Sequence, residues 1–205
     1  MSYFFAFEVP DKARTEIAVF VERWQSQVNP VLNARWVVPE NYHITLKYLG
    51  DMSLGVVDSV IKDAESTIQC TFEWRRNKGE ETKEAVIEQK ASVVFPAGRP
   101  PVLWVEIIPT NLLRSLAYGF LLFPNLAWDE REHRPYKPHI ALAYCKPEAE
   151  NGPLILTEQA FAPFTVNCFA LMETLPPEKR AIGMKARYNT VHTFPFGMKP
   201  ISDVS

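Results

Sequence analysis

Short apolar runs along the chain alternate with stretches of helical periodicity. The first run, residues 3–9, stops at Pro10 and predicts a strand. Apolar side chains then recur three and four positions apart between residues 17 and 28, and again between residues 57 and 68. This spacing predicts two amphipathic helices, the first of them capped by Asp11.

Most of the remaining segments have the composition of strands. We predict strands at residues 35–38, 42–49, 72–76, 85–95, 102–108, 137–144, 164–174 and 187–194. A third helix is expected at residues 112–122 with Thr110 as its N-cap, and the polar loop 77–84 is expected to close a long hairpin. The pattern predicts an α+β fold with antiparallel sheets. We expect residues 1–205 to form a single domain, in which the second half largely repeats the order of elements of the first.

Composition excludes several classes of protein and leaves the function open. A net charge of −2 is not that of a nucleic-acid coat protein, so any RNA contact requires a local basic groove. Three cysteines without a CxxC pair argue against a disulfide framework and favour a reducing, cytoplasmic setting. The apolar N-terminal run is too short to span a membrane, so we expect no membrane association.

Two of the four histidines lie in closely similar contexts. His43 begins the sequence His-Ile-Thr-Leu, and His139 begins His-Ile-Ala-Leu, in each case within a predicted strand. Side chains alternate between the two faces of a strand. Each histidine is therefore expected to share a polar face with residues an even number of positions away. These are Thr45 and Lys47 for His43, and Lys137 and Ala141 for His139.

Two imidazoles that face each other suit the cleavage of a phosphodiester. The unperturbed pKa of histidine is about 6.5, so near neutral pH one ring can accept a proton while the other donates one. The hydroxyl of Thr45 can donate a hydrogen bond to a phosphate oxygen, and Lys47, Lys137 and Arg134 can supply positive charge. Lys47, Lys137 and Arg134 are equally compatible with solvated surface positions. This chemistry needs neither a metal ion nor a cofactor.

The paired motifs resemble those of the two-histidine phosphoesterase superfamily, whose signature is a repeated His-x-Thr/Ser-x. The closer resemblance is to the bacterial and archaeal RNA 2′,3′-cyclic phosphodiesterases, also called 2′-5′ RNA ligases. It extends over nearly the whole chain, through the segments 3–7, 35–50, 95–104, 134–139, 164–166 and 193–195.

The resemblance implies a bilobal α+β fold of two pseudo-symmetric lobes, in which two antiparallel sheets face a central groove and helices pack outside. It also implies that His43 and His139 open a 2′,3′-cyclic phosphate to a 2′-phosphate, with RNA ends or small cyclic nucleotides as substrates. We expect the protein to act as a monomer.

The sequence departs from the family pattern at Ala141, where the motif has a hydroxyl residue. Loss of a comparable oxyanion donor costs roughly 10²–10³ in turnover. Three hypotheses therefore stay open. The protein is a 2′,3′-cyclic phosphodiesterase that Ala141 would weaken, a phosphodiesterase for another cyclic or 2′-5′-linked nucleotide, or a protein that binds nucleotides or RNA ends with little turnover.

Overall fold

The computed structural model of this chain describes residues 1–32, 34–80, 83–94, 102–120, 135–145, 155–156, 158–180 and 187–196. The α-helices are α1 (Asp11–Leu32), α2 (Leu54–Asn77) and α3 (Asn111–Gly119). The strands are β1 (Ser2–Glu8), β2 (Arg35–Trp36), β3 (His43–Asp51), β4 (Ala85–Ile87), β5 (Gln89–Val94), β6 (Val102–Ile107), β7 (His139–Tyr144), β8 (Ile155–Leu156), β9 (Phe164–Val166), β10 (Cys168–Thr174) and β11 (Tyr188–Pro195). The predicted α+β class with antiparallel strands is confirmed.

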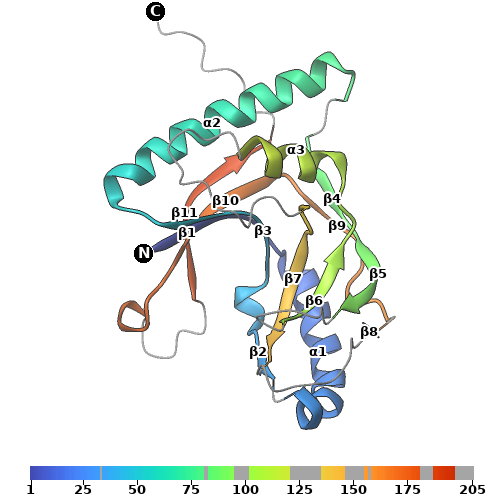
Figure 1. Ribbon diagram of the computed structural model, residues 1–205. Coiled ribbons are helices and arrows are strands. Elements are labelled where there is room, and N and C mark those ends of the chain that lie inside the picture. The colour runs from blue at the N-terminus through green and yellow to red at the C-terminus, as the bar shows by residue number, and fades with distance from the viewer. Residues whose placement is uncertain are drawn as a thin grey trace, which may run out of the picture.

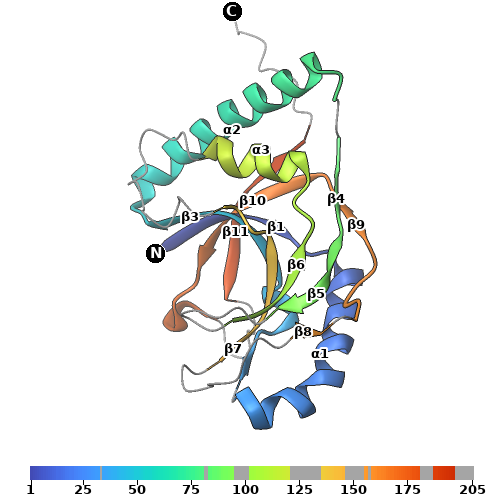
Figure 2. The same cartoon turned by 45° about the vertical axis from the view of Figure 1, so that its right-hand side comes forward.

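Within the described residues, nine strands form one antiparallel sheet in the order β11-β10-β1-β3-β7-β6-β5-β8, with β2 paired to β7. The two halves of this sheet meet where β3 and β7 pair, through the register pair of Ile44 with Ile140. The two sheets expected from the resemblance are thus two halves of one sheet. The strands of the two halves point in different directions on the two sides of this junction (Figures 1 and 2).

The strand pairs on the two sides of the junction have the same register. In the β1–β3 pair Glu8 faces His43, and in the β6–β7 pair Glu106 faces His139. Ala6 faces Thr45, as Trp104 faces Ala141. Both pairs then shift register at the next position, where the partners are Phe5 with Lys47 and Leu103 with Ala143. The two His-Ile segments therefore occupy equivalent places in the two halves.

One apolar cluster supports both halves of the sheet. It includes Phe5 and Phe7 of β1, Ile140 and Leu142 of β7, and Ile17 of α1. The helices α2 and α3 lie beside each other over the β1–β10–β11 half, and α1 lies along the other half (Figures 1 and 2). The helices thus bury one face of the sheet and leave the opposite face, which carries His43, for a site.

The region from residue 72 to residue 84 differs from our prediction. Residues 72–76 are not a strand, because α2 continues to Asn77 and buries Phe72 and Arg75 in register with its earlier apolar positions. Helical spacing outweighs the β-prone composition of this short segment. Gly79 follows the helix with φ +74°, a conformation that suits glycine after a helix end. The polar segment after Asn77 therefore connects a helix to β4 and closes no hairpin.

Two other predictions concern shorter segments. Thr110 caps α3 as expected, because its side-chain oxygen accepts a hydrogen bond from the backbone N–H of Leu113 at 3.3 Å. The expected strand 164–174 is divided in two: β9 pairs with β4 in a separate two-stranded sheet, whereas β10 belongs to the nine-stranded sheet.

Candidate active site

His43 is held at the start of β3 by its own backbone. Its Nδ1 lies 2.8 Å from the carbonyl oxygen of Asn41, two residues earlier. A carbonyl oxygen can only accept, so Nδ1 carries the hydrogen and Nε2 is left to exchange protons with a substrate. The ring also packs between Phe4 and Tyr188, with both ring centroids at 5.0 Å.

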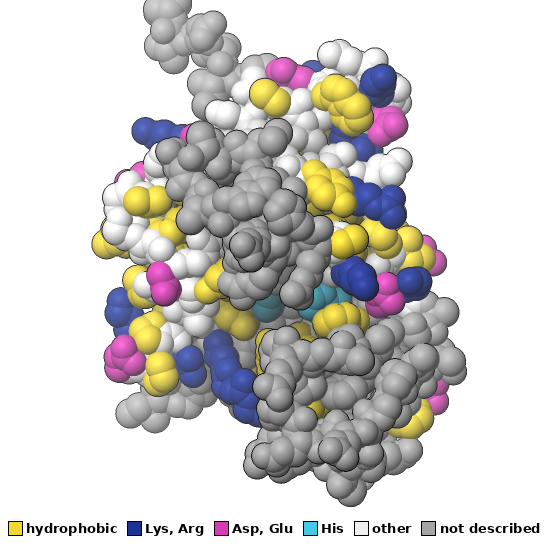
Figure 3. All heavy atoms as spheres, in the orientation of Figure 1, with side chains coloured by type: hydrophobic (Ala, Val, Ile, Leu, Met, Phe, Trp, Pro, Cys, Tyr) yellow, Lys and Arg dark blue, Asp and Glu magenta, His cyan; other side chains and the backbone are white. Residues whose placement is uncertain are grey.

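His139 has the same arrangement in the other half of the sheet. Its Nδ1 lies 2.8 Å from the carbonyl oxygen of Lys137, again two residues earlier. The ring packs against Trp104 with a centroid distance of 4.4 Å. Both imidazoles therefore have the same tautomer and a fixed orientation. Figure 3 shows histidine side chains near the centre of one face, with Lys and Arg side chains close by.

Burial makes both imidazoles harder to protonate. The pKa of His43 is lowered by burial first; the hydrogen bond to Asn41 opposes this, and the charge of nearby His139 lowers the pKa further. Burial also lowers the pKa of His139, but its hydrogen bond to Lys137 and the carboxylate of Glu106 act in the opposite direction. The effect of His139 on the pKa of His43 indicates that the two rings lie within electrostatic range of each other, and Glu106 favours the protonated form of His139.

We expect Glu106→Gln to lower the pKa of His139. The carboxylate of Glu106 favours the imidazolium form, so its removal makes protonation harder. NMR titration of the histidine ring carbons measures the shift directly.

Lys90 offers a control of opposite sign. Its Nζ lies 3.0 Å from Oε1 of Glu106 and partly offsets that carboxylate. Lys90→Gln should therefore raise the pKa of His139. If both variants moved this pKa in the same direction, the role given to Glu106 would be wrong.

The hydroxyl of Thr45 lies on the same face of β3 as His43. Its register partner in the β1–β3 pair is the small residue Ala6. At the equivalent place in the other half, Ala141 faces the large side chain of Trp104. In this half of the sheet the large side chain thus belongs to Trp104 of β6, and the second motif has no hydroxyl at Ala141.

The expected alternation is wrong at Lys47. Because the register of β1 and β3 shifts between Phe5 and Ala6, Lys47 pairs with the core residue Phe5 and is only 8% exposed. Tyr48, 53% exposed, takes the outward position instead. Lys47 is therefore not on the His43 face of β3, and we do not include it in the phosphate site.

The other expected phosphate contacts are less constrained. Lys137 is exposed and precedes β7, so its ammonium group as a phosphate contact stays a prediction. Arg134 lies outside the described residues. No group of three or more His, Cys, Asp or Glu side chains suited to hold a metal ion is found in the described part of the chain.

Sequence reasoning missed several neighbours of the two imidazoles. Asn41 contributes a backbone carbonyl, a group that every residue type carries, so its residue type gave no signal for this contact. Glu106, Trp104 and Tyr188 are brought in by strand pairing from distant segments. Locating them required the register of the sheet.

No helix in the described ranges has the length and apolar character needed to cross a membrane.

A family model described as LigT-like phosphoesterase matches residues 13–79. The RNA 2′,3′-cyclic phosphodiesterase of Aquifex aeolicus (strain VF5) is 30% identical over 141 residues, which are 66% of this chain and 66% of that protein.

Solved structures with low sequence identity share the fold over nearly the whole chain. TT0787 of Thermus thermophilus has a TM-score of 0.66 at 20% identity, over 96% of this chain and 98% of that one. Escherichia coli LigT complexed with NADP⁺ has the same TM-score, identity and coverage. Together with the sequence matches and the repeated His-Ile segments, this likeness shows that the chain belongs to the LigT-like phosphoesterase family of the two-histidine superfamily.

Proposed function

We propose that this protein hydrolyses 2′,3′-cyclic phosphate ends of RNA or nucleotides to 2′-phosphates, with His43 and His139 as its acid–base pair. The observation that carries the proposal is the matched anchoring of the two rings. Each donates from Nδ1 to a carbonyl two residues earlier, and each therefore presents Nε2 for proton transfer. The name of the Aquifex aeolicus relative supports the choice of substrate.

The proposed reaction assigns one role to each ring. Neutral His43 takes a proton from the attacking water as its oxygen bonds to phosphorus, and the bond between phosphorus and O3′ breaks. Protonated His139 gives its proton to O3′, which leaves as the 3′-hydroxyl of a 2′-phosphate. We assign the acid role to His139 because Glu106 favours its protonated form. Proton exchange with water restores both rings.

Thr45 is proposed to hold the phosphate during this step. The antiparallel pair Ile44–Ile140 places Thr45 on the His139 side of the junction, and Ala141 on the His43 side. A hydroxyl there can donate a hydrogen bond to a non-bridging oxygen as negative charge develops on it. Of the two motifs, only the first supplies a hydroxyl at this position.

The test is hydrolysis of 2′,3′-cyclic mononucleotides in the presence of EDTA, with the product identified by phosphorus NMR. The proposal expects a 2′-phosphate and an unchanged rate when EDTA is added. A 3′-phosphate product, or loss of activity with EDTA, would contradict the mechanism.

The alternative function, binding without useful turnover, rests on Ala141. Ala141→Thr discriminates the two. A rise in turnover by orders of magnitude would identify a weakened phosphodiesterase, whereas unchanged slow turnover together with tight nucleotide binding would favour the binding function.

A further inference from the structure

A pocket of about 210 Å³ opens beside His43. Three arginines and two tyrosines line it together with Asn41; they are Arg35, Arg180, Arg187, Tyr144 and Tyr188. We call it the arginine pocket. Arg35 lies in β2, Tyr144 ends β7 and Tyr188 begins β11. Arg187 directly precedes β11.

Two of the three guanidinium groups of the arginine pocket have neutral partners. Arg180 donates from Nε and Nη2 to the carbonyl oxygen of Leu175 at 3.0 and 2.7 Å. The guanidinium of Arg35 lies 5.3 Å from the ring centroid of Tyr144. Among the described residues, no carboxylate lines the pocket and none of the three arginines forms a salt bridge. Their positive charge is therefore available to an anion.

The charges converge on Tyr188, which also contacts His43. Burial raises the pKa of Tyr188, while Arg187, Arg35 and Arg180 each act to lower it, so all three lie close enough to influence its hydroxyl. The ring of Tyr188 packs against the imidazole of His43, with their ring centroids 5.0 Å apart.

Asn41 forms a second connection between the arginine pocket and His43. Its backbone carbonyl accepts from Nδ1 of His43, and its side-chain oxygen accepts from the backbone N–H of Arg187 at 2.7 Å. Asn41 is buried, so this connection is fixed by the fold. The arginine pocket is thus a direct neighbour of the proposed catalytic pair.

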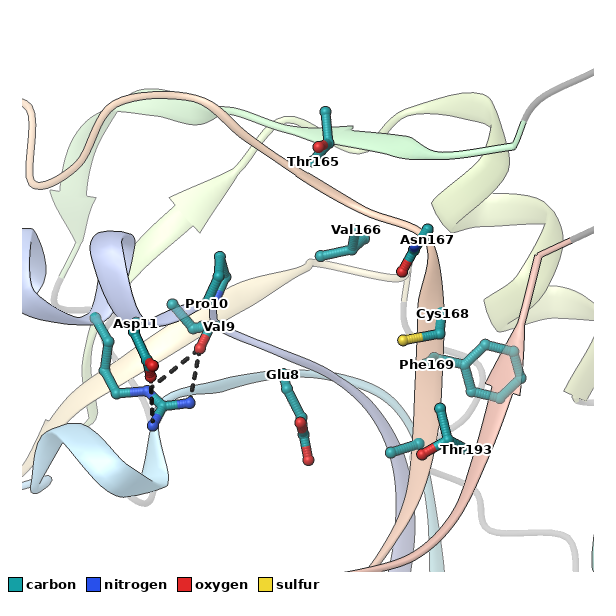
Figure 4. A pocket seen from close by; sticks show the side chains of 12 residues that line it. Glu8, Val9, Pro10, Asp11, Thr165, Val166, Asn167, Cys168, Phe169 and Thr193 are labelled. Carbon is teal, nitrogen blue, oxygen red and sulfur yellow. Dashed lines mark hydrogen bonds and ion pairs between the residues drawn. The ribbon is translucent and has the colours of Figure 1, made fainter.

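The larger cavity nearby has the wrong charge for an anion. It measures about 400 Å³, and its lining includes Glu8 and Asp11 (Figure 4). The arginine in its lining, Arg14, is already paired with Asp11 at 3.3 Å and with the carbonyl oxygen of Val9. Two carboxylates and an engaged arginine disfavour phosphate there.

We propose that the arginine pocket binds a second phosphate of the substrate, the one on the 5′ side of the nucleotide that carries the cyclic phosphate. Guanidinium groups match phosphate oxygens in charge and in geometry. This proposal rests on the proposed function, which places the cyclic phosphate between His43 and His139. The second phosphate belongs either to an RNA chain or to a free nucleotide with a 5′-phosphate.

Binding tests the pocket without relying on turnover. Isothermal titration compares adenosine 2′-phosphate with adenosine 2′,5′-bisphosphate. The added phosphate should tighten Kd by roughly 10- to 100-fold, as expected for charge-assisted hydrogen bonds. The double variant Arg180→Gln with Arg187→Gln should lose most of this gain in affinity. The single variant Arg35→Gln, at an exposed position, should also lose most of it. Arg76→Gln, an exposed arginine on α2, is the matched control and should keep it.

Equal Kd values for the two ligands in the unmodified protein would overturn the proposal. So would an equal loss of the gain in Arg76→Gln. Because Arg35 is exposed, Arg35→Gln provides the test even if the double variant fails to fold.

Kinetics identify the source of the second phosphate. KM is measured for three substrates: adenosine 2′,3′-cyclic phosphate, its 5′-phosphorylated form, and a dinucleotide that ends in the cyclic phosphate. The KM values of the last two are compared with that of the first. A lower KM for the dinucleotide indicates an RNA end, and a lower KM for the 5′-phosphorylated nucleotide alone indicates a free nucleotide. A KM lowered by neither would overturn the proposal. If none of the three substrates were hydrolysed, the proposed function would be overturned. The binding comparison would then still test whether the arginine pocket binds a phosphate.

Discussion

His43→Ala and His139→Ala should each lower turnover of a 2′,3′-cyclic nucleotide by about 10²–10⁴, because each removes one partner in proton transfer. Steady-state hydrolysis measures the loss. His192→Ala is the matched control, since His192 lies outside the two motifs and contacts Glu65 at 3.5 Å. Its turnover should stay within a few-fold of the unmodified protein.

The fold of each histidine variant can be checked by circular dichroism and thermal melting. Near-normal turnover in a folded His43→Ala or His139→Ala protein would refute the acid–base assignment. Loss of activity in His192→Ala alone would point to a different site.

Thr45→Ala should lower turnover by roughly 10²–10³, the cost of one oxyanion donor. The effect is expected to be large because the second motif has Ala141 and offers no hydroxyl in compensation. Thr45→Ser keeps the hydroxyl and should retain most of the activity. Measurement of kcat separates the two variants.

The backbone near Thr45 is fixed independently of its side chain, because Tyr136 donates its hydroxyl hydrogen to the carbonyl oxygen of Thr45 at 3.2 Å. Thr45→Ala is therefore expected to fold. Equal losses in Thr45→Ala and Thr45→Ser would show that the hydroxyl is not the phosphate donor.

The sequence predicted the parts of the fold that depend on local pattern. The α+β class and the positions of His43 and His139 on strands follow from periodicity and repeated context. Lys47 was misplaced because a register shift reverses the alternation, and such a shift depends on the partner strand. Residues 72–76 were misassigned because a short segment with two aromatic residues is compatible with both helix and strand.

The neighbours of the site depend on long-range pairing. Arg35, Arg180 and Arg187 converge in one pocket although more than a hundred residues separate the first from the others. No local motif links them, so a single sequence gives no signal. That residues 1–205 form one domain of two pseudo-symmetric lobes stays a prediction, and the matching registers of β1–β3 and β6–β7 support it.

The single register pair Ile44–Ile140 also bears on how the two halves of the sheet could move relative to each other. His43 and His139 directly precede these two residues, so both imidazoles lie next to the point where the halves of the sheet meet. A rotation about that point moves each atom in proportion to its distance from it. The spacing of the imidazoles would then change little while the far strands β8 and β11 separate widely. Proton-transfer geometry and substrate width can thus vary independently in such a fold.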